Sequence, residues 1–146
     1  PVGHPVLDGY VALAELALGD WDRAKARDRD TMDARRRAET AVHALDIYRR
    51  VFPIGVPAWR RLAGEVAQRR GNAPAARREF EAAIAAAERL DMWPEIGLGH
   101  LALRGVLSDD NPLRAVHAVQ AADALASSGI RKTVDDTEAI GLGGSS

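Results

Sequence analysis

Residues 59–83, WRRLAGEVAQRRGNAPAARREFEAA, decide the fold class that this chain is expected to have. Ala76, Phe80 and Ala83 are spaced at i, i+4 and i+7, so they share one helical face, and that face has to be buried. In the Gly-Asn-Ala-Pro turn before them, the side chain of Asn72 can accept a hydrogen bond from a free backbone N–H group. The stretch therefore predicts two helices joined by a short turn.

The same apolar pattern occurs three times along the chain, at spacings of 38 and 39 residues. The positions that match Ala76, Phe80 and Ala83 are Ala38, Val42 and Leu45 in the first copy and Ala115, Val119 and Ala122 in the third. Asn111 and Pro112 supply the chemistry of a helix start before the third copy. No run of residues alternates as a strand would. We expect an all-α fold, an α-solenoid of about three antiparallel helix pairs.

The periodicity predicts six helices and their boundaries. They are expected at about residues 6–18, 33–51, 57–70, 73–90, 93–107 and 112–127, which gives repeats at about 6–52, 57–91 and 94–128. Gly19 is expected to end the first helix and to open a charged insertion, residues 20–33. Ser128 and Gly129 are expected to follow the end of the last helix. The repeat domain then spans 1–132, and 133–146 is either a tail or the start of a further repeat.

Composition excludes several classes of function. The chain has 146 residues, seven of them aromatic, so its core has to be built from Ala and Leu. It has no cysteine, which excludes disulfides and thiolate metal sites and is compatible with a cytoplasmic location. The net charge is −1, and the arginines are mixed with acids along the helices, so we expect no nucleic-acid partner. The apolar stretch at residues 6–18 is interrupted by Asp8 and Glu15 and is too short to span a bilayer, so we expect no membrane partner. Because the chain begins with Pro1 rather than Met, we expect it to be either a processed chain or a piece of a longer protein.

Several of these residues resemble the tetratricopeptide repeat. Trp59, Leu62 and Gly64 correspond to the residues that mark its first helix, and Ala76, Phe80 and Ala83 to those that mark its second. The segment 87–103 is similar to the longer, degenerate repeats of large bacterial ATPase regulators, nucleotidyl cyclases and kinases. The resemblance is best over residues 57–107. It departs from the family in its period, which exceeds the usual ~34 residues, and in Leu103, where a glycine is expected.

The resemblance implies a module without chemistry of its own, which binds peptides or helices or holds a neighbouring domain inactive. We therefore expect a non-catalytic protein–protein interaction or regulatory module, part of a larger bacterial signalling or transcription-regulatory protein. The alternative is a sensor that binds a peptide or small molecule in the concave groove of the superhelix. An enzyme that uses side chains from several helices is a weaker third possibility.

Motifs that carry chemistry are weak in this chain. None of its four histidines forms an HExxH motif or a similar zinc pair. Asp28, Asp30 and Asp33 are closely spaced but lack the glycine and the terminal glutamate of a calcium loop. Gly97 and Gly99 do not follow a strand, so they are expected to mark a close contact between helices rather than a phosphate loop. We expect no catalytic residue, metal or cofactor.

The resemblance implies a partner site on the concave face, which the first helices of the second and third pairs would line. The residues that match by register are Arg61, Glu65, Gln68, Arg69, His100 and Arg104. Arginine suits an acidic peptide or helix because its guanidinium can hold a carboxylate with two hydrogen bonds. The alternative is an ordinary solvated face. If the site is real, reversing the charges of Arg61 and Arg69 should abolish binding and leave the melting temperature nearly unchanged.

Two further expectations concern the first helix and the insertion after it. The helix is apolar around most of its circumference, which is typical of a helix covered on two sides, so we expect it to mediate self-association or to contact a preceding repeat. Trp21 lies among charged residues. It either staples the insertion onto the fold or anchors a partner.

Overall fold

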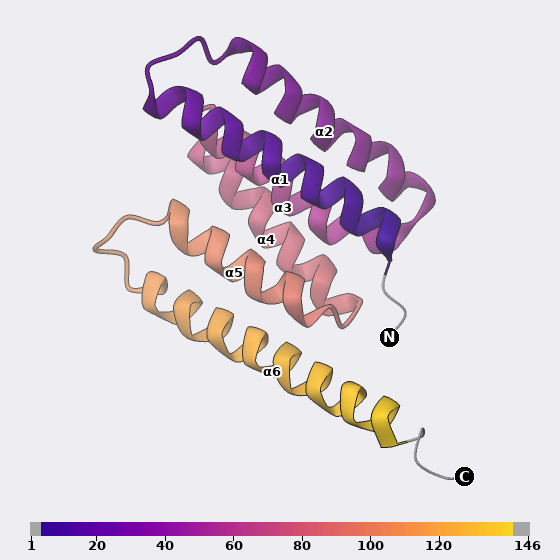
Figure 1. Ribbon diagram of the computed structural model, residues 1–146. Helices are drawn as coiled ribbons and strands as arrows, with labels where there is room; N and C mark the ends of the chain where they lie inside the picture. The colour runs from indigo at the N-terminus through magenta and orange to yellow at the C-terminus, as the bar shows by residue number, and fades with distance from the viewer. Residues whose placement is uncertain (1–3, 142–146) are drawn as a thin grey trace.

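The structure of the protein is a computed structural model that describes residues 4–141, with side chains described as far as residue 129 (Figure 1). Its elements are α1 (Pro5–Ala26), α2 (Met32–Val51), the short 3-10 helix η1 (Pro53–Gly55), α3 (Val56–Arg69), α4 (Ala73–Arg89), α5 (Trp93–Val106) and α6 (Leu113–Gly141). No residue between 4 and 141 is in a strand. The prediction of an all-α fold is confirmed.

Each α-helix packs against the next one along the chain. In addition, α1 contacts α3, and α3 contacts α5. Figure 1 shows the helices side by side, with α2 and then α1 at one end, followed by α3, α4 and α5, and with α6 at the other end. The loops α1–α2 and α5–α6 lie at the same edge, on the left of the view. Contacts are therefore made between neighbours, and the two end helices each have a side that no described helix covers.

Glycines let the helices approach closely in the middle of the molecule. Phe80 is fully buried, and a Cβ atom on Gly64 would lie 2.5 Å from its ring. A Cβ atom on Gly99 would lie 2.6 Å from the side chain of Ile84, and one on Gly97 would lie 2.6 Å from that of Leu125. These separations are too short for any side chain. The prediction that Gly97 and Gly99 mark close helix contacts is confirmed.

The expected helix starts are also present. The side-chain oxygen of Asn72 accepts a hydrogen bond from the backbone N–H of Ala75 at 3.1 Å, at the start of α4. Asn111 accepts one from the N–H of Leu113 at 2.9 Å, where α6 begins. Gly71 has a φ angle of +77°, which only glycine adopts without strain, so it ends α3 cleanly.

The expectation that Gly19 ends the first helix is wrong. Helix α1 continues to Ala26, and the loop that follows extends only over residues 27–31. Trp21 is 6% exposed and packs in the core that α1 shares with α2 and α3. Burying an aromatic side chain of this size stabilises the helix by more than the roughly 1 kcal/mol that an interior glycine costs. Half of the expected insertion is therefore an extension of α1.

The last helix is longer than expected. Helix α6 does not end at residue 127 but runs on to Gly141. The hydroxyl of Ser127 donates a hydrogen bond to the backbone carbonyl of Asp123 at 2.9 Å, as a serine inside a helix does. The backbone of residues 133–141 belongs to α6, and residues 142–146 of the expected tail lie outside the described residues.

The third apolar triplet is not buried. Ala115, Val119 and Ala122 are all exposed, and α6 instead buries Ala121 and Ala124 toward α5. The burial expected from the repeat pattern is wrong for this copy. In the first two copies the next helix along the chain shares a core with the triplet. No described helix follows α6, so the same face of α6 is open to solvent.

Candidate functional site

Large apolar side chains are exposed mainly at the two ends of the helix stack. Among the side chains described, as far as residue 129, four lie on α1, three on α2, one on α5 and four on α6, whereas α3 and α4 have none. The four on α1 are Val6, Tyr10, Leu13 and Leu16. A scattered exposed leucine needs no explanation, but a stripe of them along one helix marks a surface for another molecule or segment.

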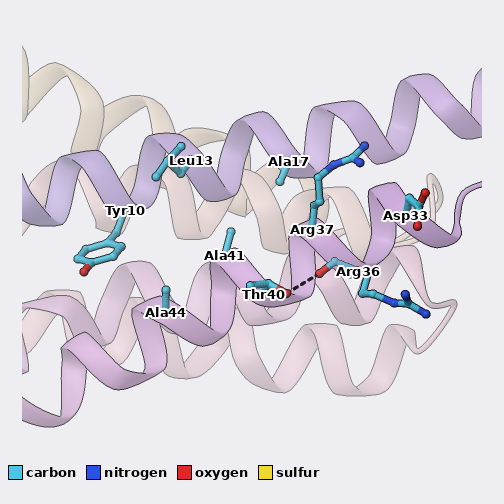
Figure 2. Close-up of a pocket in the computed structure, with 9 residues that line it drawn as sticks. All are labelled: Tyr10, Leu13, Ala17, Asp33, Arg36, Arg37, Thr40, Ala41 and Ala44. Atoms are coloured by element: carbon cyan, nitrogen blue, oxygen red, sulfur yellow. Dashed lines mark hydrogen bonds between the residues drawn. The ribbon is translucent and has the colours of Figure 1, made fainter.

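An open groove runs between α1 and α2 beside this stripe (Figure 2). We call it the docking groove. It has a volume of about 500 Å³ and is lined by Tyr10, Leu13, Ala17, Asp33, Arg36, Arg37, Thr40, Ala41 and Ala44. Its floor is made of small residues, because alanines from both helices face each other there. Leu13 is 62% exposed at its rim. A groove with small residues along its floor has room for the side chains of a further helix.

The two ends of the docking groove differ in chemistry. At one end Tyr10 lies against Tyr48, with ring centroids 5.6 Å apart, and Tyr48 lies against Phe52 at 4.9 Å. At the other end Arg36 and Arg37 of α2 line the groove, and the side chain of Arg37 extends toward α1. The groove is therefore aromatic at the start of α1 and basic at the start of α2.

The basic end continues into a second, polar hollow of about 420 Å³ beside the α1–α2 loop. Asp33 and Arg37 line both cavities. Arg27 and Arg29 also line the hollow, and neither they nor Arg36 and Arg37 form an ion pair within the described residues. Arginines without a carboxylate partner favour binding of an acidic group.

Arg61, the first of the residues predicted to bind a partner, lies in a buried ion cluster rather than on an open face. Its side chain is 7% exposed, and its Nε lies 2.9 Å from Oε2 of Glu95 on α5. Its Nη2 lies 3.3 Å from Oε1 of Glu15 on α1. Burial would lower the pKa of Arg61, but Glu95 and Glu15 together raise it above its usual value. The cluster ties α1, α3 and α5 together.

A second ion cluster occupies the next turns of the same helices. The guanidinium of Arg69 lies 2.7 Å from Asp22 of α1 and 2.6 Å from Glu65. Gln68 and Arg104 are exposed. An acidic peptide would have to displace the protein's own carboxylates from Arg61 and Arg69. That this face binds a partner stays a prediction, and the structure brings only part of the predicted set together.

His100 is buried at the contact between α5 and α6. Its Nδ1 lies 3.0 Å from Nδ1 of His117, and the two rings stack with centroids 5.2 Å apart. Burial and the neighbouring His117 lower the pKa of His100, against the opposing charge of Glu88. Among the described residues, no three His, Asp or Glu side chains converge as metal ligands. Two roles were considered for Trp21, holding the insertion onto the fold or anchoring a partner. Its position in the core supports the first.

Sequence reasoning noticed the apolar circumference of α1 but missed the groove. The signal that it overlooked lies on α2, where Arg36, Thr40 and Ala44 follow one another at i, i+4 and i+8. That stripe is basic at one end and small at the other. This stripe lines a groove only because α2 packs beside α1, and that packing belongs to the tertiary structure.

Comparison with known proteins adds no further information. No protein-family model matches the chain, and neither a curated protein nor a solved structure matches it. Within the part of the chain that the structure describes, every helix is too short or too polar to cross a bilayer. Function has to be argued from the surfaces of the protein itself.

Proposed function

We propose that this protein is a non-catalytic helical-repeat module that binds a partner helix in the docking groove between α1 and α2. The observation that carries the proposal is the groove itself, which combines an apolar rim, a floor of alanines and a cluster of unpaired arginines at one end. The proposal includes a regulatory role within a larger signalling protein, which rests on the resemblance to tetratricopeptide-like repeats.

The proposed architecture is a short α-solenoid of three antiparallel pairs, α1–α2, α3–α4 and α5–α6. The pattern of contacts supports it, because each first helix contacts the first helix of the next pair as well as its own partner. The ion clusters of Arg61 and Arg69 join first helices of different pairs in the same way. In such a solenoid the outer face of the first pair is the place where a preceding pair would pack.

The chemistry of the groove defines the partner. An amphipathic helix would lay its apolar stripe along Tyr10 and Leu13 and bury it against the alanines of α2. Acidic residues at one end of that helix would meet Arg36 and Arg37. The apolar contact supplies affinity, and the charges set the direction in which the helix binds.

Binding of a synthetic helix tests the proposal. The probe is a fluorescent amphipathic peptide with a stripe of alanine and leucine and with glutamates at one end. Its anisotropy should rise on titration with the protein. Leu13→Asp places a charge on the apolar rim and should weaken binding at least about tenfold, which corresponds to about 1.4 kcal/mol.

Two controls make the result specific. Leu90→Asp changes another exposed leucine, 43% exposed against 62% for Leu13, which lies between α4 and α5, far along the chain from the groove. This variant should bind the peptide as the unmodified protein does. A peptide with lysines in place of the glutamates should bind more weakly. Equal loss of binding in Leu13→Asp and Leu90→Asp, or no binding by the unmodified protein, would refute the proposal.

A further inference from the structure

We infer that the occupant of the docking groove is helix α6 of a second copy of this chain, so that copies join head to tail. This inference rests on the proposed function, because it names the partner of the same groove. In the assembly, α6 of one copy packs along the α1 side of the groove of the next, as α2 packs on α3 within one copy. Three independent features of the structure support it.

The free face of α1 has the spacing of a face that is already used inside the molecule. Tyr10, Leu13 and Ala17 are spaced at i, i+3 and i+7. The residues of α3 with the same spacing are Trp59, Leu62 and Val66. Those three pack in the core that α3 shares with α2. An aromatic residue, a leucine and a smaller apolar residue therefore recur on α1. Leu13 is 62% exposed, whereas Tyr10 contacts Tyr48 of α2 and Ala17 is partly buried.

Helix α6 exposes the matching surface. The residues of α2 that share the core with α3 are Ala38, Val42 and Leu45. Their counterparts in the repeat register are Ala115, Val119 and Ala122, all of them exposed, with Val119 at 61%. Helix α6 thus presents to solvent the face that α2 presents to α3. The corresponding face of α2 is covered by α3, the first helix of the next pair. Helix α1 is also the first helix of a pair and could cover this face of α6 in another copy.

The charges at the ends of the two surfaces are complementary. The α1–α2 loop carries Arg27 and Arg29, which form no ion pair within the described residues. The α5–α6 loop lies at the same edge of the molecule and carries the exposed Asp109 and Asp110, of which Asp109 also lies 3.3 Å from Arg114 (Figure 1). A head-to-tail junction brings these two loops together, because it places consecutive helix pairs side by side.

An existing junction within the chain already uses such charges. Between the first and second helix pairs, Asp22 pairs with Arg69 at 2.7 Å, and Glu39 pairs with Arg70 at 2.6 Å. These pairs join the last turns of α1 and the first half of α2 to the end of α3. The same kind of pairing between Arg27 or Arg29 of one copy and Asp109 or Asp110 of the next would fix the register of the junction between copies.

Such an interface is heterologous, since two different surfaces meet. A heterologous contact leaves one free groove and one free α6 face on every assembly, so association does not stop at the dimer. The mass of the assembly should therefore rise continuously with protein concentration. An interface of α1 with α1, by contrast, would be symmetric and would stop at two copies.

Sedimentation of two complementary variants tests the inference. Leu13→Asp blocks the groove, and Val119→Asp blocks the α6 face. Both side chains are exposed, so both variants should fold, which circular dichroism checks. Each variant alone should associate at least about tenfold more weakly than the unmodified protein. An equimolar mixture should recover one junction, between the groove of the Val119→Asp chain and α6 of the Leu13→Asp chain, and should stop at a dimer. Leu90→Asp should associate as the unmodified protein does.

The outcomes separate this inference from the proposed function. A protein that stays monomeric at every concentration overturns head-to-tail assembly. Loss of association in Leu13→Asp alone, without rescue in the mixture, overturns it in favour of a symmetric contact of α1. In either case, binding of the synthetic helix by the unmodified protein and its loss in Leu13→Asp would leave the docking groove established. Failure of both experiments would remove the proposed function as well.

Discussion

Arg61 shows how a single residue can join three helices. Its guanidinium meets Glu15 from α1 and Glu95 from α5, and the Glu95 side chain is only 14% exposed. A carboxylate in such a place depends on its partner, because water can solvate it only partly. Reversing the charge of Arg61 would therefore place it against Glu15 and Glu95 and should lower the melting temperature, contrary to the expectation from the sequence.

Replacing Arg61 with Met should destabilise the fold. The substitution keeps the length of the side chain but leaves Glu95 without its partner, and removing one member of a buried pair costs about 3–5 kcal/mol. The matched control is Arg77→Met, since Arg77 pairs with Glu81 on the surface of α4, where both side chains are about half exposed. The control should cost less than about 1 kcal/mol. Urea denaturation measures the free energy of unfolding of both variants. If the urea midpoint of Arg61→Met equals that of the unmodified protein, the Arg61 cluster contributes nothing to stability.

At the scale of a helix pair, the contact between α5 and α6 depends on two histidines. His100 is buried and its pKa lies below the usual 6.5, first because of burial and then because of His117. Below about pH 6.5, the histidine therefore binds a proton more readily in the unfolded chain than in the folded one. The free energy of unfolding should therefore fall as the pH drops through this value.

The melting temperature should be lower at about pH 5.5 than at about pH 7.5. The acids with shifted pKa values, Glu39, Asp46 and Asp110, are all shifted downward from 4.5 or less, so they stay ionised over this range. His100→Gln should flatten the pH dependence, whereas His43→Gln, a change on the exposed face of α2, should preserve it. A dependence that persists in His100→Gln would assign the effect to another group.

At the scale of the whole molecule, stability should vary along the stack. The central helices α3 and α4 are covered on both sides, whereas α1 and α6 each have one open face. In proteins built from stacked repeats, each unit is stabilised by its neighbours, so end units open more easily. Amide hydrogen exchange in dilute solution should be slowest in α3 and α4 and faster in α1 and α6. Uniform protection would instead indicate one cooperative unit without separable repeats.

The sequence by itself determined the features that depend on near neighbours in the chain. Asn72 and Asn111 begin helices because their side chains reach N–H groups two or three residues on. The apolar period of 3.6 residues is enough to predict all-α structure. Gly97 and Gly99 lie in a helical, apolar segment, which already indicated the close approach of another helix.

Only the tertiary structure decided which surfaces are covered. Arg61 pairs with residues 34 and 46 positions away, and no local pattern distinguishes it from an arginine on a solvated face. The third triplet, around Val119, has the same spacing as the two buried ones, yet it is exposed because no described helix follows α6. Burial depends on what packs against a face, and that neighbour lies far along the chain or, as we propose for α6, on another molecule.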